Sequence, residues 1–185
     1  MMIEMWNQKS CLFQLKDDEK GTPLHLASYS NYLDSVKFLI DKLPNSVLEY
    51  DGDGNFPIHV ACKMDHIQVI EALLQQWPDP AEFRTEQGQN ILHVSVSHGS
   101  IAAVKYILAN PRLEHLINEK DQNENSALHL AAMNWEPAAL LVLARDQRVD
   151  PKLVNMDNLT ALDFVEGQLR GIDVPLREVH TNYSL

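Results

Sequence analysis

Four histidines occupy the same place in a recurring phrase, and histidine readily binds transition metals or transfers protons near neutral pH. The phrase has four positions: a small or polar residue, a residue that is often Pro, an apolar residue and His. Its clearest copy is Thr22-Pro23-Leu24-His25. Later copies end at His59, His93 and His129, and a fifth, Thr160-Ala161-Leu162-Asp163, ends in Asp. The last residues of successive copies are 34, 34, 36 and 34 residues apart in a chain of 185 residues. Such a period predicts a solenoid of stacked units, each in contact only with its neighbours.

A shared metal site is the first chemistry that these histidines suggest, and the period argues against it. Stacked units lie roughly 10 Å apart, as packed helices do. Zinc ligands must all lie about 2.1 Å from one ion. The four rings therefore cannot hold one metal together. We expect each ring to bond main-chain groups and tie one unit to the next, and we predict no metal and no cofactor.

Asp51-Gly52-Asp53-Gly54-Asn55 looks at first like a calcium loop. An EF-hand loop needs Gly at its sixth place and Glu at its twelfth, where this chain has Phe56 and Cys62. The segment is instead predicted to be the tip of a hairpin, since its glycines can adopt positive φ. Cys62 occupies a small-residue place on a helix, which favours a buried thiol over a nucleophile.

Catalysis has little support in the sequence. Ser95 and Ser97 lie near His93 and His98, but nothing places an oxyanion site beside them. The chain has no glycine pattern of the Walker or dinucleotide-binding type. We therefore predict that the protein is not an enzyme.

Residues 51–76 show how one unit is expected to fold. Pro57 suits the first position of a short helix, because its missing N–H would have no partner there. A second helix is expected from about Ile67 to Gln76, with Ile70, Leu73 and Leu74 on one face. The same face recurs in register one period before and one and two periods after, at Val36, Leu39 and Ile40; Val104, Ile107 and Leu108; and Leu140, Leu143 and Ala144. One helix pair is too small to bury this face alone, so neighbouring units must stack.

The phrase, the small-residue helix, the turn and the second helix together resemble the ankyrin repeat, and Thr22-Pro23-Leu24-His25-Leu26-Ala27 matches its core letter for letter. The segment Leu113–Asp121 before the fourth phrase, and Arg148-Val149-Asp150 before the fifth, are similar to plant ankyrin proteins of the accelerated-cell-death type. In that family a cytosolic array precedes a PGG domain with several transmembrane helices. The resemblance implies a role in membrane-associated stress and defence signalling. Nothing after Gly167 resembles that membrane domain.

The sequence departs from the repeat pattern at several turns. Trp135 stands where a glycine is expected between two helices. Asn31 and Asp65 replace the same glycine in other units, and these residue types tolerate a left-handed backbone better than most. Glu124 and Asn158 replace the glycine of the loop that precedes the first helix.

Composition narrows the possible partners and the cellular location. The net charge of −11 makes DNA or RNA an unfavourable partner, because phosphate binding needs clustered Lys and Arg. No stretch approaches the roughly 20 apolar residues of a membrane span. Two cysteines, Cys11 and Cys62, cannot form a disulfide framework. We expect a location in the cytoplasm or on the cytoplasmic face of a membrane, the plasma membrane if a family-type membrane domain is joined.

The expected architecture is an all-α ankyrin-repeat solenoid over residues 1–167. Residues 1–16 are expected to be a partial repeat, and further units are expected to start near 17, 51, 85, 121 and 155. An irregular tail is expected over residues 168–185. The motif positions that should hold the units together are Thr22, Pro23, His25, Pro57, His59, His93 and His129.

The expected function is that of a non-enzymatic module that binds other proteins through its concave face. The alternative is a structural fragment of a membrane channel-like or signalling assembly, with no independent activity. Candidate contact positions on the helix ends are Tyr29, Lys63, Met64, His98, Met133 and Trp135. Candidates on the loops are Asp53, Asn55, Gln87, Gln89, Asn123 and Asn125. Tyr29 and Trp135 are the first choices, because Tyr and Trp are enriched in binding hot spots; Trp135 could equally be a plug for an irregular turn.

Overall fold

The computed structural model of the chain describes residues 15–17, 21–76 and 83–171. The predicted partial repeat at 1–16 lies outside the described residues except for Leu15 and Lys16, which have no regular structure. The predicted tail also lies outside them from residue 172 onward. The last described helix ends at Leu169, two residues beyond the expected end of the array.

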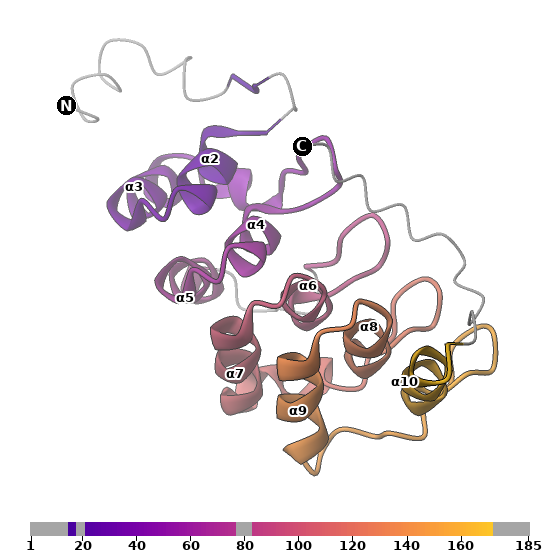
Figure 1. Cartoon of the computed structure of the whole chain (residues 1–185). Helices are drawn as coiled ribbons and strands as arrows, with labels where there is room; N and C mark the ends of the chain where they lie inside the picture. Colours follow the sequence, from indigo (N-terminus) through magenta and orange to yellow (C-terminus); the bar gives the residue numbers. More distant parts are fainter. Residues whose placement is uncertain (1–14, 18–20, 77–82, 172–185) are drawn as a thin grey trace.

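Short helices are stacked in two layers (Figure 1). The first helices of the units form one layer, which consists of α2 (Pro23–Tyr29), α4 (Pro57–Lys63), α6 (Ile91–Ser97), α8 (Ala127–Met133) and α10 (Ala161–Leu169). The second helices form the other layer, which consists of α3 (Leu33–Lys42), α5 (Ile67–Gln76), α7 (Ile101–Ala109) and α9 (Pro137–Arg145). Short 3-10 helices, η2 (Pro44–Leu48) and η4 (Pro111–Leu116), follow α3 and α7. The predicted all-α solenoid is confirmed.

A loop precedes each of the first helices α4, α6, α8 and α10 and projects beyond the first-helix layer, away from the second helices (Figure 1). We call these loops fingers and number them by unit: finger 2 is residues 51–56, finger 3 is 85–90, finger 4 is 121–126 and finger 5 is 155–160. Finger 5 is closed by an isolated antiparallel bridge between Val154 and Thr160.

The recurring phrase starts each first helix as expected. Pro23 and Pro57 are the first helical residues of α2 and α4, where a missing N–H costs nothing. At the start of α6, Asn90 replaces Thr and still caps the helix, because its Oδ1 accepts hydrogen bonds from the N–H groups of Leu92 and His93, both at 3.0 Å. Phe56 has no such group and instead packs against Tyr50 and Phe83.

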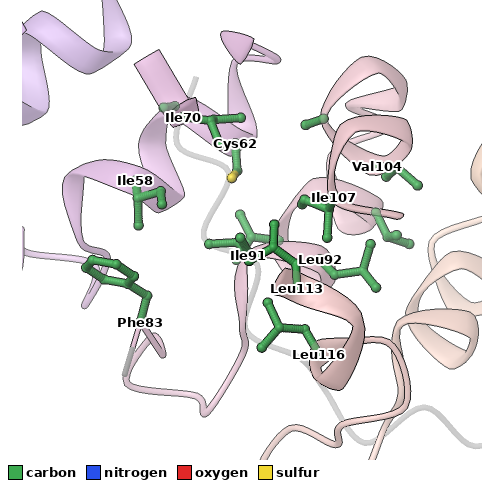
Figure 2. Packing of buried hydrophobic residues seen from close by; sticks show 14 of the residues in the cluster. Ile58, Cys62, Ile70, Phe83, Ile91, Leu92, Val104, Ile107, Leu113 and Leu116 are labelled. Carbon is green, nitrogen blue, oxygen red and sulfur yellow. The ribbon is translucent and has the colours of Figure 1, made fainter. Parts of the chain in front are cut away.

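The core is a continuous strip between the two layers rather than one central cluster. Figure 2 shows part of it, where Cys62 of α4 and Ile70 of α5 face Ile91 of α6 and Ile107 of α7. The apolar face predicted for the second helices is buried in α3, α5 and α7. Of the three positions predicted in α9, Leu143 is fully buried, Leu140 is half-buried and Ala144 is exposed, so the expected register holds there only in part.

Two turns of the repeat require a left-handed backbone, and the sequence identified both. Between the paired helices, Asn31, Asp65, Gly99 and Trp135 have φ values from 54° to 65°. In the fingers, Gly54, Gly88, Glu124 and Asn158 have φ values from 58° to 75°. Glycine adopts this region without strain, whereas a bulky residue such as Trp does so rarely.

Candidate functional site

The four motif histidines form a ladder that joins each unit to the next. In each, Nδ1 accepts a hydrogen bond from the main-chain N–H three residues earlier, at 3.1–3.2 Å. Because Nδ1 accepts, Nε2 must carry the proton. His25 and His93 donate it to the carbonyls of Asn55 (3.0 Å) and Asn125 (3.1 Å) in the following finger, and His129 donates to Leu159 (3.0 Å).

His59 reaches a different carbonyl. Its Nε2 lies 3.2 Å from the oxygen of Phe83, which precedes finger 3, instead of the finger residue used by the other histidines. Phe83 is itself fully buried against Phe56. The histidine of the second unit therefore bonds to the segment before finger 3 and not to the finger itself.

Burial fixes these rings in the neutral form. Loss of solvation lowers the pKa of His59 to about 3 and also lowers the pKa values of His25, His93 and His129. A neutral ring can accept at one nitrogen and donate at the other, and the ladder uses both. The residues that the structure describes contain no group of three or more His, Cys, Asp or Glu that could hold a metal ion.

The first residue of each finger has a structural role that the sequence analysis missed. Oδ1 of Asp51 accepts hydrogen bonds from the N–H groups of Asp53 (3.0 Å) and Asn55 (2.8 Å), and so closes finger 2. The same bonds to residues two and four places further on are made by Thr85, Asp121 and Asn155 in the later fingers. The sequence could have predicted this role, because an Asp, Asn or Thr recurs at the expected unit starts and such side chains close turns in this way.

Main-chain hydrogen bonds also join the fingers to one another. The N–H of Glu86 donates to the carbonyl of Gly54 (3.1 Å), and that of Gln122 donates to Gln87 (3.0 Å). A Cβ on Gly54 would lie 2.5 Å from the Cγ of Glu86, so the close approach depends on glycine there. The fingers therefore form a fixed row.

Most of the candidate contact residues lie at the surface. Among those on the helix ends, Tyr29 is 57% exposed, Trp135 50% and Met64 38%, while His98 is also exposed and Lys63 and Met133 are half-buried. On the fingers, Asp53, Gln87 and Asn123 are exposed and Gln89 is half-buried.

Two finger candidates are placed wrongly by the sequence analysis. Asn55 is 4% exposed and Asn125 2% exposed, and their carbonyls receive the histidine protons of the ladder. The Asn125 side chain also accepts a hydrogen bond from Asn155 at 3.0 Å. These two asparagines therefore help to hold the stack together and are too deeply buried to contact a partner.

The structure brings four of the candidates together in one hollow. Tyr29, Asp53, Lys63 and Met64 line a cavity of about 350 Å³ between the first two described units. Its remaining walls include Leu26, Val60, Asp17 and Asp51, which the sequence analysis did not select. The other candidates repeat along the array at equivalent helix ends and fingers and do not line this cavity.

Cys62 and Ser95 are structural. Cys62 is fully buried, which raises the pKa of its thiol to about 12, and the hydroxyl of Ser95 donates to the carbonyl of Ile91 at 2.7 Å. A thiol in this state is a poor nucleophile. The predicted buried thiol is confirmed.

Comparisons with known proteins agree with this geometry. A model of three ankyrin repeats matches residues 43–121, and a single-repeat model matches residues 20–47, so that together they cover more than half of the chain. The chain belongs to the ankyrin-repeat family, whose members are typically modules for protein–protein interaction.

Several characterised proteins are similar over most of this chain. Palmitoyltransferase AKR1 of Lachancea kluyveri is 30% identical over 82% of the chain. Protein ACCELERATED CELL DEATH 6 of Arabidopsis thaliana is 28% identical over 86% of it, in accord with the predicted resemblance. A probable 26S proteasome regulatory subunit, p28, of Saccharomyces cerevisiae is 27% identical over 70% of it. The chain spans 21%, 24% and 57% of these relatives' own lengths, so the similarity concerns their repeat regions.

None of the helices in the described part of the chain has the length and apolar character needed to cross a membrane.

Proposed function

We propose that this protein is a non-enzymatic docking module that binds other proteins through the surface formed by its finger tips and the carboxyl-terminal ends of its first helices. The observation that carries the proposal is the set of exposed Tyr29, Met64 and Trp135 side chains at equivalent helix ends of different units. Tyr, Trp and Met are enriched at the centres of interfaces and depleted where a surface only needs solvation.

Rigidity supports the same proposal. The histidine ladder and the finger-to-finger bonds hold the successive units, and with them the helix ends that carry these side chains, in a fixed arrangement. A preorganised surface loses less conformational entropy on binding, so more of the contact energy appears as affinity.

A pull-down with immobilised protein from an extract of the source cells tests the proposal. Proteins captured by the parent should be lost from the double variant Tyr29→Ala/Trp135→Ala. A matched control is Lys37→Ala/Lys105→Ala, which truncates two exposed side chains on the second helices α3 and α7. Equal recovery of every protein by all three baits would show that this surface is not the docking surface.

We further propose a place in membrane-associated signalling, at the cytoplasmic face of a membrane. The support is the similarity to ACCELERATED CELL DEATH 6 along most of this chain. The test is a full-length transcript from the source organism, which should encode membrane helices downstream. The alternative role, a structural part of a channel-like assembly without activity of its own, predicts that the isolated chain captures no protein at all.

A further inference from the structure

The hollow between the first two described units has a distinctive chemistry. Its apolar wall consists of Leu26, Tyr29 and Met64, of which Leu26 is 62% exposed. Large apolar side chains that remain exposed beside a cavity favour an occupant with apolar surface of its own.

Carboxylates also line the hollow. Asp17, Asp51 and Asp53 all border the cavity, and among its lining residues in the described part of the chain Lys63 supplies the one ammonium group. Oδ1 of Asp51 closes finger 2, whereas its second carboxylate oxygen makes only a long contact of 3.4 Å, to the side-chain amide of Asn55. Asp53 is exposed and has no side-chain hydrogen bond or ion pair within the described residues. The excess of negative charge excludes an anionic occupant.

We propose that this hollow binds an arginine side chain of the partner protein, an inference that rests on the docking function above. The methylene stem of an arginine would pack against Leu26 and Met64, and its guanidinium would stack on the ring of Tyr29. The N–H groups of the planar guanidinium would donate hydrogen bonds to the carboxylates of Asp53 and Asp51. Lysine offers the same charge without the planar stacking surface, so arginine is the better fit. The net charge of −11 on the whole chain adds long-range attraction for a basic partner.

The later units do not repeat the full set of residues that line this hollow. At the place of Tyr29 and Lys63, the third unit has Ser97, and at the place of Leu26 and Val60 it has Val94, which is buried. At the place of Asp53, fingers 3 and 4 have the uncharged Gln87 and Asn123. The proposed cation-binding subsite therefore lies at this end of the described array, and the exposed Trp135 lies further along.

Nuclear magnetic resonance titration with a small probe tests the inference without a known partner. The probe is N-acetyl-arginine methylamide, and its control is N-acetyl-citrulline methylamide, which has the same shape and no charge. The arginine probe should shift the signals of the Tyr29 ring, the Met64 methyl group and the finger 2 amides in a saturable way. The citrulline probe should not. Equal responses to both probes, or no response to either, would overturn the inference.

Single variants sharpen the test. Asp53→Asn should weaken arginine binding about two- to fivefold, the range expected for an exposed ion pair, and Tyr29→Ala should weaken it to a similar degree. Lys63→Gln should strengthen binding, because it removes a competing positive charge. The matched control is Asp157→Asn, since Asp157 occupies the place of Asp53 in finger 5 and is exposed there. A loss for Asp157→Asn equal to that for Asp53→Asn, or weaker binding by Lys63→Gln, would contradict a specific subsite.

The two proposals fail in different ways. The docking surface fails if the pull-down recovers the same proteins with the parent and with Tyr29→Ala/Trp135→Ala. The arginine subsite fails if the parent protein does not distinguish arginine from citrulline, whatever the pull-down shows.

Discussion

At the scale of single residues, the motif histidine combines two hydrogen-bonding roles that few other side chains can replace. Its Nδ1 closes the first turn of its own helix and its Nε2–H reaches the next finger. Asp163 in the fifth unit shows the limit of substitution. Its carboxylate accepts from the N–H and the hydroxyl of Thr160, both at 2.7 Å, but an ionised carboxylate has no proton to donate.

Replacement of His93 by Ala should lower the free energy of unfolding by about 1–3 kcal/mol, because it leaves the buried carbonyl of Asn125 and the N–H of Asn90 without partners. Denaturant unfolding followed by circular dichroism measures the change. The control is His115→Ala, since His115 is exposed on η4. A His93→Ala protein that unfolds at the same denaturant concentration as the parent would refute the ladder role.

At the scale of elements, the helix–turn–helix unit places a left-handed residue between its two helices. Asn31, Asp65 and Gly99 are residue types that tolerate this backbone, and Trp135 is not. Trp135 is half-exposed, so packing in the core does not account for a bulky residue at this strained position. Strain of this kind is concentrated at functional sites, which agrees with a contact role for the indole.

The strain at position 135 can be measured apart from the loss of the indole. Trp135→Gly should be more stable than Trp135→Ala by about 0.5–1 kcal/mol, because only glycine adopts φ 54° without a steric penalty. The same pair at Asn134, where φ is −84°, should show the opposite order. Thermal unfolding of the four variants decides the point, and an equal melting temperature for both variants at position 135 would mean that the turn is not strained.

At the scale of the whole molecule, the ladder couples the stability of successive units to pH. His25, His59, His93 and His129 all have pKa values lowered by burial, so the unfolded chain binds more protons than the folded one below the ordinary histidine pKa of 6.5. The stabilisation is complete above pH 6.5 and is lost as the pH falls toward the folded values.

Stability should therefore decrease between pH 7.5 and pH 5.5, by about 1.4 kcal/mol for each histidine that stays neutral in the folded state. Asp and Glu side chains remain largely ionised over this interval and contribute little to the slope. Urea unfolding at several pH values measures the effect, and His93→Ala should show a shallower slope than the parent. A stability that rises or stays constant as the pH falls to 5.5 would contradict neutral, buried rings.

The sequence alone determined the repeat, and with it the helices, the turns and the strip of apolar residues between the layers. Local periodicity is sufficient for this, because each unit contacts only its neighbours and the pattern of one unit is the pattern of all. Pro57 at the start of α4, the bounds Ile67–Gln76 of α5 and the left-handed Trp135 all follow from short-range chemistry.

Only the tertiary structure decided which finger residues are free. Asn55 and Asn125 look as polar and as accessible as Asp53 in the sequence, yet their carbonyls serve the ladder and they are buried. The tertiary structure also decided that Asp17, Leu26 and Asp51 join Tyr29, Asp53 and Met64 around one hollow. These residues come from two units and from both fingers and helices, and their meeting depends on how the units stack, which periodicity within one unit does not specify.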